Sequence, residues 1–256
     1  MQPASAPNPS TPPITVIGAG RVGGSLTRAL RSGGVEVSTV GREGPASATE
    51  VAILCVPDGE IESACELAVT AAPGIRFVGH SSGATTLSAL SSAFAAGAEA
   101  FSLHPLQTIP DAETDLTGAP AAVAGSSAAA VGLAHRIAET CRMVPFDVPE
   151  ESRAAYHAAA AIASNFLVAL ESSAEELLAA AGIENGRELL APLVLRSAAN
   201  WAERGSDALT GPIARGDEST VARHLEAIAE TAPELEPMYR SLAERTREMA
   251  TAGRTP

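Results

Sequence analysis

The stretch Ile14-Thr-Val-Ile-Gly18-Ala-Gly20-Arg-Val-Gly23 decides the fold of this chain. Four β-branched residues predict a strand, and G-x-G-x-x-G follows them and opens a segment of helical periodicity. In this setting Gly18 makes a tight turn, Gly20 lets the backbone approach a pyrophosphate, and Gly23 lets the helix pack on the strand. The helix N-terminus supplies amide donors to phosphates. We therefore predict a dinucleotide site that includes Gly18, Gly20, Arg21, Val22 and Gly23.

The same alternation of strand and helix patterns continues to residue 147 and predicts βαβ units around a mostly parallel sheet. The expected strands are residues 14–17, 35–40, 51–56, 75–79, 98–102, 121–124 and 143–147, and the expected helices are 22–32, 59–71, 85–96 and 127–141. Beyond Pro149 the strand patterns disappear, and four or five helices are expected. The predicted organisation is a disordered tail (1–12), a doubly wound α/β domain of the Rossmann type (13–148) and an all-α substrate and dimerisation domain (149–256).

The end of the second expected strand, Ser38-Thr-Val-Gly-Arg42, indicates which dinucleotide binds. A site for NAD usually has Asp or Glu here to bind both ribose hydroxyls, and this stretch has neither. Arg42 can pair with a 2′-phosphate through two hydrogen bonds, which favours NADP(H). The alternative is that Arg42 is a solvated loop residue.

Three further strand ends are expected at the same edge of the sheet. The apolar run from Val51 ends in Val56-Pro57-Asp58, whose backbone is a candidate to flank the cofactor, with Asp58 as a helix cap. The next two strands run into His80-Ser81-Ser82-Gly83 and His104-Pro105. Because ligands of open α/β sheets bind at the carboxyl ends of the strands, Ser81, Ser82 and His104 are candidate catalytic residues. The alternatives are helix capping for the serines and a loop hydrogen bond for the histidine.

Charge and composition exclude several classes of function. Lys+Arg is 17 against Asp+Glu 30, a net charge of −13, and every basic residue is an arginine. Without lysine there is no Schiff base and no pyridoxal-phosphate anchor. An acidic chain without basic runs disfavours nucleic acid and anionic membranes as partners. The three cysteines form no CxxC pair and the five histidines lack zinc spacing, so no metal is expected. The first 13 residues lack the pattern of a signal peptide, which predicts a cytoplasmic protein.

Several motifs together resemble one family over residues 13 to 250. They are GAGRVG (18–23), HSSGA (80–84), FSLHPLQT (101–108), YHAAAAIASN (156–165) and LTGPIARGD (209–217). The chain resembles Rossmann-like proteins with a DUF2520 C-terminal domain, in the 6-phosphogluconate dehydrogenase-like superfamily. The resemblance implies an NADP-linked oxidoreductase whose helical domain usually dimerises, and some members are thought to be ketopantoate reductases. The serine turn and the His-Pro pair are also similar to prephenate dehydrogenases, which again implies Ser81 or Ser82 and His104.

One departure from the superfamily affects the expected chemistry. Many members have a catalytic lysine four residues before an asparagine on the first long helix of the second domain, and here Asn165 is preceded at that distance by Ala161. His157 lies about two helical turns before Asn165, so both are expected to lean toward the cleft, whereas Tyr156 is expected on a different face. On a later loop, Arg215 is a candidate to bind a substrate carboxylate.

These observations predict an NADPH-dependent reductase of a small carbonyl acid, with 2-dehydropantoate as the substrate that the resemblance implies. His104 or His157 would protonate or polarise the substrate oxygen, Asn165 with Ser81 or Ser82 would orient it, and Arg215 would bind the acid group. A homodimer through the C-terminal helices is expected. The alternatives are a prephenate dehydrogenase-like enzyme and a regulatory protein that binds NADP(H) without turnover, which the missing lysine favours.

Overall fold

The computed structural model describes residues 11–41 and 49–252. The chain divides into two compact units, Met1–Ala161 and Ile162–Pro256. The first unit therefore extends past the expected domain boundary near residue 148 and includes the first turns of helix α5 (Arg153–Ala163), whose side chains contact the sheet.

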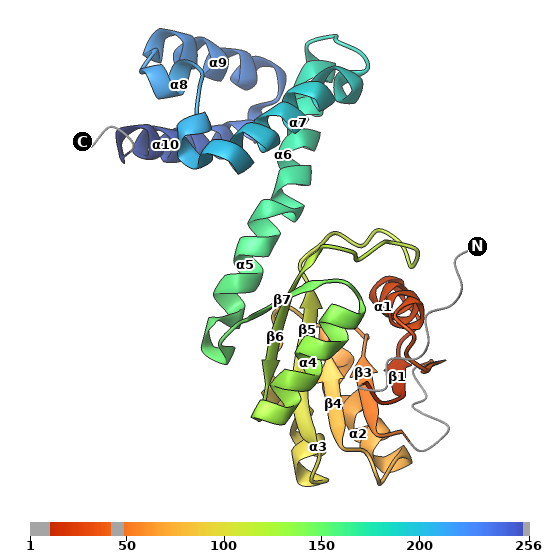
Figure 1. Ribbon diagram of the computed structural model, residues 1–256. Helices are drawn as coiled ribbons and strands as arrows, with labels where there is room; N and C mark the ends of the chain where they lie inside the picture. Colours follow the sequence, from red (N-terminus) through yellow and green to blue (C-terminus); the bar gives the residue numbers. More distant parts are fainter. Residues whose placement is uncertain (1–10, 42–48, 253–256) are drawn as a thin grey trace. The chain divides into compact units, whose positions relative to one another are not determined.

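The first unit is built on one seven-stranded sheet of order β2-β1-β3-β4-β5-β6-β7 (Figure 1). The strands are β1 (Ile14–Ile17), β2 (Val37–Val40), β3 (Val51–Leu54), β4 (Phe77–His80), β5 (Glu99–Pro105), β6 (Pro120–Gly125) and β7 (Val144–Asp147). All neighbouring pairs are parallel except β5 and β6. The predicted fold class, a doubly wound and mostly parallel sheet followed by helices, is confirmed. Each predicted strand is present, with ends displaced by a few residues at most.

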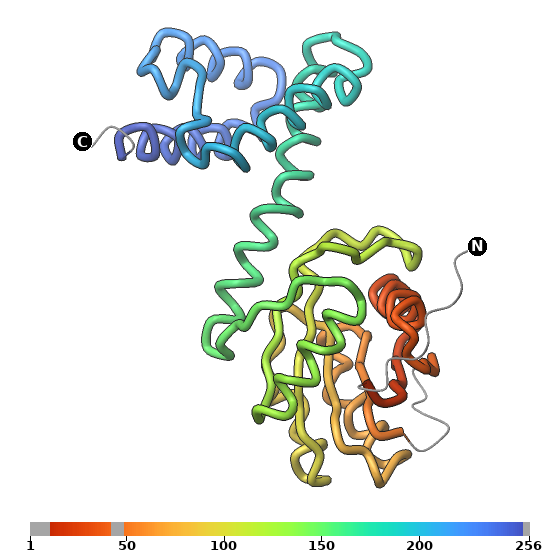
Figure 2. The backbone as a smooth tube through the Cα atoms, in the orientation of Figure 1, coloured from red at the N-terminus to blue at the C-terminus, as the bar shows by residue number. Residues whose placement is uncertain are grey.

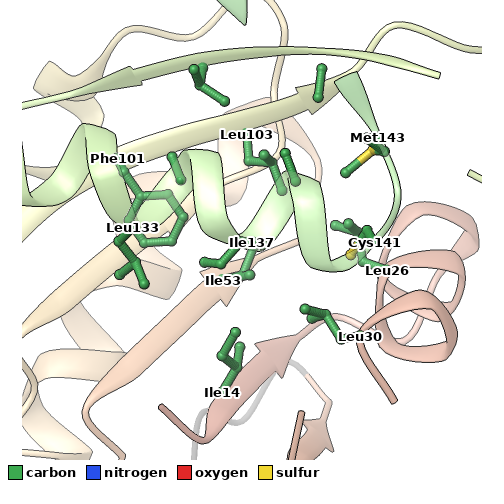
Figure 3. Packing of buried hydrophobic residues seen from close by; sticks show 14 of the residues in the cluster. Ile14, Leu26, Leu30, Ile53, Phe101, Leu103, Leu133, Ile137, Cys141 and Met143 are labelled. Atoms are coloured by element: carbon green, nitrogen blue, oxygen red, sulfur yellow. The ribbon is translucent and has the colours of Figure 1, made fainter. Parts of the chain in front are cut away.

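Helices cover both faces of this sheet and bury two apolar clusters. On one face α1 (Arg21–Ser32) and α4 (Ala128–Thr140) pack through Leu26, Leu30, Leu133 and Ile137 onto strand residues such as Phe101 (Figure 3). On the other face lie α2 (Ile61–Ala71), α3 (Ser91–Ala95) and two short 3-10 helices, η1 (Asp58–Glu60) and η2 (Leu87–Leu90). Because both faces are covered, β3 consists only of apolar residues and β1 is apolar apart from Thr15, as expected for strands of a buried parallel sheet.

The strand register brings four carboxyl ends to one edge. Ile17 of β1 pairs with Leu54 of β3, Leu54 with His80 of β4, and His80 with Ser102 of β5. The strand order reverses at β1, because β2 lies on one side of it and β3 on the other. This is the topological switch point at which open α/β sheets bind their ligands.

The second unit is helical. It holds the last residues of α5, then α6 (Asn165–Ala180), α7 (Gly186–Arg204), η4 (Gly205–Ala208), α8 (Pro212–Arg215), α9 (Glu218–Thr231), η5 (Pro233–Leu235) and α10 (Glu236–Ala252). Figure 2 shows the short turn at residues 181–185 that reverses the chain between α6 and α7. None of the helices in the described ranges is long and apolar enough to cross a membrane.

Candidate active site at the carboxyl edge of the sheet

The glycine loop after β1 is held by both neighbouring strands. Gly18 has φ +104°, a backbone conformation that side chains rarely adopt, and its N–H donates to the Val40 carbonyl at 2.9 Å. A Cβ on Gly18 would lie 2.3 Å from the carbonyl oxygen of Cys55, and one on Gly23 would lie 1.9 Å from the oxygen of Gly18. These two glycines are therefore needed for the close packing of the loop on β3 and α1.

Gly20 differs, because a Cβ built on it would meet no atom of the described structure within 4 Å apart from those of Gly20 and its two chain neighbours. Gly20 is exposed and is the N-cap of α1, so the free amides of the first helical turn, which begins at Arg21, face the same open space. Packing within the protein therefore does not require glycine at this position. Binding of a phosphate close to the backbone does require it, because a side chain would keep the phosphate away from the amides. The loop thus fits the pyrophosphate of a dinucleotide.

Two other predicted cofactor positions lie beside this loop, and one lies outside the described residues. Val56 lies beside Gly18, because a Cβ built on this glycine would be 3.4 Å from Cγ1 of the valine. Pro57 is exposed after the end of β3. The expectation that Asp58 caps a helix is wrong: it is the first residue of η1, whose N-cap is Pro57 and has no side-chain cap bond. Arg42 lies outside the described residues.

A cluster of polar side chains lies at the ends of β4 and β5. Because side chains alternate along a strand, Ser102 and His104 of β5 point to the same face. The Nδ1 atom of His104 lies 2.7 Å from the hydroxyl of Tyr156 on α5. The residue after Tyr156 is His157, and the centroid of its imidazole lies 6.0 Å from that of His104. The structure thus brings two predicted histidines together, and it corrects the expectation that Tyr156 faces elsewhere.

Gly83 of the serine turn packs against both imidazoles. A Cβ at this position would lie 2.6 Å from Cδ2 of His157 and 2.9 Å from Nε2 of His104. Only glycine leaves room for the two rings, which explains why the turn after β4 ends in this residue.

The two serines of this turn make local hydrogen bonds. The Ser82 hydroxyl accepts from the N–H of Ala84 and of Thr85, at 3.2 and 3.0 Å, and donates to the Thr85 hydroxyl. The Ser81 hydroxyl lies 3.4 Å from the Leu54 carbonyl. Ser82 therefore acts as a turn cap, the structural alternative that its sequence context allowed, and Ser81 holds the turn against β3.

A fully buried arginine that sequence reasoning missed ties these parts together. Arg153 is 0% exposed and donates to the Ser102 hydroxyl at 2.7 Å and to the Ser82 carbonyl at 2.6 Å. Glu150 lies 3.7 Å from its guanidinium and accepts a hydrogen bond from the Leu87 N–H. Arg153 thus joins α5, β5 and the serine turn. The available signal was its spacing, because residues three and four positions after it are Tyr156 and His157.

Burial sets the protonation states at this cluster. It lowers the pKa of His104 to about 4, with further lowering by the charges of His157 and Arg153 and an opposing effect of Asp58. The pKa of His80, fully buried beneath the serine turn, is also lowered to about 4, first by burial and then by Arg153. Burial raises the pKa of Tyr156 to about 12. Near neutral pH, His104 and His80 are therefore uncharged and Tyr156 is protonated.

These shifts predict that acid destabilises the fold. The pKa of His80 and of His104 is about 4 in the folded state and 6.5 in an ordinary histidine. Between these two pH values both side chains are therefore uncharged in the folded protein but protonated in the unfolded protein. The free energy of unfolding should thus fall as the pH drops through this range, by about 1 to 2 kcal/mol for each histidine at pH 5. Urea unfolding at pH 7.5 and 5 measures the difference, and His104→Gln should remove about half of it. Equal stability at the two pH values would contradict these pKa values.

Two predicted substrate residues belong to the second unit. Asn165 is exposed and is the first residue of α6, and Arg215 is exposed and ends α8. The backbone at Ser164, with φ −122° and ψ −71°, interrupts the helix between α5 and α6. The regular spacing that was expected to align His157 with Asn165 is therefore broken. No group of three or more His, Cys, Asp or Glu side chains suited to a metal ion occurs among the residues described.

Comparison with known proteins shows a family and a fold. The family model described as domain of unknown function DUF2520 matches residues 119–246. A comparison with curated proteins found no match. Among similar solved structures is a Bacteroides fragilis protein described provisionally as an NADP oxidoreductase, with 22% identity and a TM-score of 0.77 over 93% of this chain and 98% of its own. The Thermotoga maritima protein TM1727 has 21% identity and a TM-score of 0.77 over 94% of this chain and 100% of its own. A reductive aminase from Aspergillus terreus in complex with NADPH has 14% identity and a TM-score of 0.67 over 94% of this chain and 98% of its own.

Proposed function

We propose that this chain, which belongs to the DUF2520 family, is an NADP(H)-dependent oxidoreductase that reduces a small carbonyl acid. The observation that carries the proposal is the juxtaposition at one sheet edge of an open glycine loop and the cluster that holds His104 and His157. The loop at Gly20, after β1, suits a dinucleotide, and His104 lies near the end of β5, three strands further along the same edge. The structural neighbours described as an NADP oxidoreductase and as an NADPH complex support this class of activity.

The cofactor would be held by the backbone of Gly18, Gly20 and Gly23 and by the amides of Arg21 and Val22. Val56 and Pro57 would flank it, and Arg42 would bind the 2′-phosphate. When bound, NADPH supplies a hydride. The protein must then bind the substrate, orient its carbonyl and stabilise the negative charge that develops on the oxygen.

His104 is the best candidate to stabilise that oxygen. With a pKa of about 4 it is an uncharged imidazole at neutral pH, so it acts by donating a hydrogen bond rather than as an imidazolium. His157 is exposed beside it and is a candidate to pass a proton to the product oxygen. Ser81 would orient the carbonyl, whereas Ser82 is committed to its turn. Asn165 and Arg215 belong to the second unit, and their roles in substrate binding stay predictions from the sequence. Among carbonyl acids, 2-dehydropantoate is the first to assay.

Cofactor titration tests the proposal. Wild-type protein should bind NADPH more tightly than NADH, and Gly20→Ala should weaken NADPH binding at least 10-fold, because the added methyl group occupies the space through which a phosphate reaches the backbone. Arg42→Ala should reduce the preference for NADPH by roughly 1.5 to 3 kcal/mol. Fluorescence titration of reduced cofactor measures both effects.

The control for Gly20→Ala is its own stability. Apart from Gly20 and its two neighbours in the chain, no atom of the described residues lies within 4 Å of the added methyl group, so the free energy of unfolding should change by less than about 1 kcal/mol. Unchanged NADPH affinity in the folded variant would remove the loop from the cofactor site, and equal affinity of the wild type for NADPH and NADH would overturn the choice of cofactor.

We also propose that the helical unit forms a homodimer. Large apolar side chains on α6 and α7 are exposed: Phe166, Val168, Leu189, Leu193, Leu195 and Trp201. A second copy that covers such a surface gains free energy from burying it. Light scattering should give twice the mass of one chain at micromolar concentration, and a monomeric mass would contradict the proposal.

A further inference from the structure

The hydrogen bond between Tyr156 and His104 leaves two arrangements of protons. The hydroxyl oxygen and Nδ1 are 2.7 Å apart, and the rings meet edge to face with an angle of 85° between their planes. A neutral imidazole has a single N–H. Either Tyr156 donates to Nδ1 and the imidazole proton is on Nε2, or Nδ1–H donates to the phenol oxygen and Nε2 is a bare acceptor. In the first arrangement Nε2 offers a hydrogen bond to a substrate oxygen, and in the second it is a base.

The chemistry of the two groups favours the first arrangement. A phenol, with a pKa of about 10, is a much stronger acid than a neutral imidazole, and an imidazole nitrogen is a much stronger base than a phenol oxygen. The O–H···N bond is therefore the stronger of the two. The separation of 2.7 Å also agrees with it, because this is a typical distance for a hydroxyl donor and the short limit for an N–H donor.

We propose that Tyr156 is a positioning residue that donates its hydroxyl proton to Nδ1 of His104 and so holds the imidazole proton on Nε2, where it can be offered to a substrate oxygen. The role of the tyrosine in turnover rests on the proposed reductase function. The tautomer itself does not.

Packing contacts hold both rings of the Tyr156–His104 pair in position. The Tyr156 ring contacts Phe146 of β7, with centroids 6.0 Å apart. Gly83 lies against the opposite end of His104, close to Nε2. Within the described ranges no hydrogen bond to this Nε2 is formed, so its N–H is available to a ligand. The Tyr156 hydroxyl and Gly83 therefore hold the His104 ring in place, while its Nε2 atom has no hydrogen-bond partner among the described residues.

The charged and titratable groups around His104 keep both partners in the required protonation state. His157 and Arg153 act on it from α5, Asp58 acts from the turn after β3, and His80 lies on the neighbouring strand β4. Burial, followed by the charges of His157 and Arg153, lowers the pKa of His104 to about 4 against an opposing effect of Asp58, and burial raises the pKa of Tyr156 to about 12. The hydroxyl proton and the single imidazole proton are therefore both present across the neutral range.

Nitrogen NMR of protein labelled with ¹⁵N-histidine tests the tautomer without any substrate. At pH 7 we expect Nε2 of His104 to be protonated and Nδ1 unprotonated, with the signals assigned by their loss in His104→Gln. In Tyr156→Phe, which keeps the ring and its contact with Phe146, the Nδ1 signal should shift and both tautomers should become populated. A protonated Nδ1 in the wild type would overturn the proposal.

The helical unit provides a matched control. Tyr239 and His224 form a second pair of the same kind, with the hydroxyl 2.7 Å from Nδ1, on α10 and α9. In a carbonyl acid reduction assay Tyr156→Phe should lower kcat about 10-fold or more with NADPH affinity unchanged, whereas Tyr239→Phe should leave kcat unchanged. Equal kcat values in both variants would refute the positioning role. If the wild type shows the Nε2–H tautomer and reduces no carbonyl acid, the tautomer assignment stands and the proposed function fails.

Discussion

His104→Ala is expected to lower kcat for carbonyl reduction by about 10² to 10⁴ while NADPH affinity stays nearly the same. The imidazole lies near the end of β5, three strands along the sheet from β1, which carries the glycine loop, so we do not expect it to contribute to binding the pyrophosphate. Its Nε2 would act on charge that develops only in the transition state, which is why the loss should appear in kcat. Steady-state kinetics with 2-dehydropantoate and a panel of small 2-oxo acids measures it.

Two further variants sharpen this test. His135→Ala removes an exposed pair with Asp147, at 2.8 Å, and should leave kcat unchanged. His157→Ala shows whether the exposed neighbour shares the role, since comparable losses in both variants would indicate a shared proton path. Full activity in both His104→Ala and His157→Ala would exclude the histidine mechanism and leave Ser81 or a bound water as the donor.

Arg153→Met is expected to lower the free energy of unfolding by about 2 to 4 kcal/mol. The substitution preserves much of the side-chain volume but leaves the Ser102 hydroxyl and the Ser82 carbonyl without their donor and Glu150 without its cation. Unsatisfied polar groups at a fully buried position cost far more than the same groups in water. Urea unfolding at pH 7.5 measures the loss.

An arginine at the surface is the control. Arg76 pairs with Glu50 at 3.4 Å, with both side chains more than half exposed, so Arg76→Met should cost less than about 1 kcal/mol. A second effect distinguishes Arg153 from any core residue: its charge lowers the pKa of His80 and His104, so Arg153→Met should raise both. Equal losses of stability in the two arginine variants would show that Arg153 does not brace the serine turn.

Local sequence patterns were sufficient for the parallel core. Four β-branched residues at Ile14–Ile17 and the apolar run from Val51 are strands, because short β-branched or apolar runs that end at turn residues suit a strand buried on both faces. Strand ends were less predictable, and β5 continues to Pro105 instead of residue 102. Its last residues pair with β6, a partner distant in sequence, so no local pattern marks where the strand stops.

The site was predictable where chain direction alone brings residues together. Every strand from β1 to β5 runs the same way, so residues that follow these strands meet at one edge, and Ser81 and His104 could be placed there without coordinates. The partners of these residues could not. Tyr156 and Arg153 reach His104 and Ser102 across 52 and 51 positions of sequence. A helical pattern gives the spacing of residues on α5 but not the surface on which the helix docks.

The sequence by itself determined the element order, the dinucleotide loop and the sheet edge at which the site forms, because these depend on backbone conformation and on local alternation of apolar residues. Only the tertiary structure decided the chemistry at that edge. Burial lowers the pKa of His104, a glycine contact limits its position and a tyrosine hydroxyl binds its Nδ1 atom. Each of these effects depends on which distant groups surround the imidazole, and hence on the exclusion of water from around it, which no stretch of sequence encodes alone.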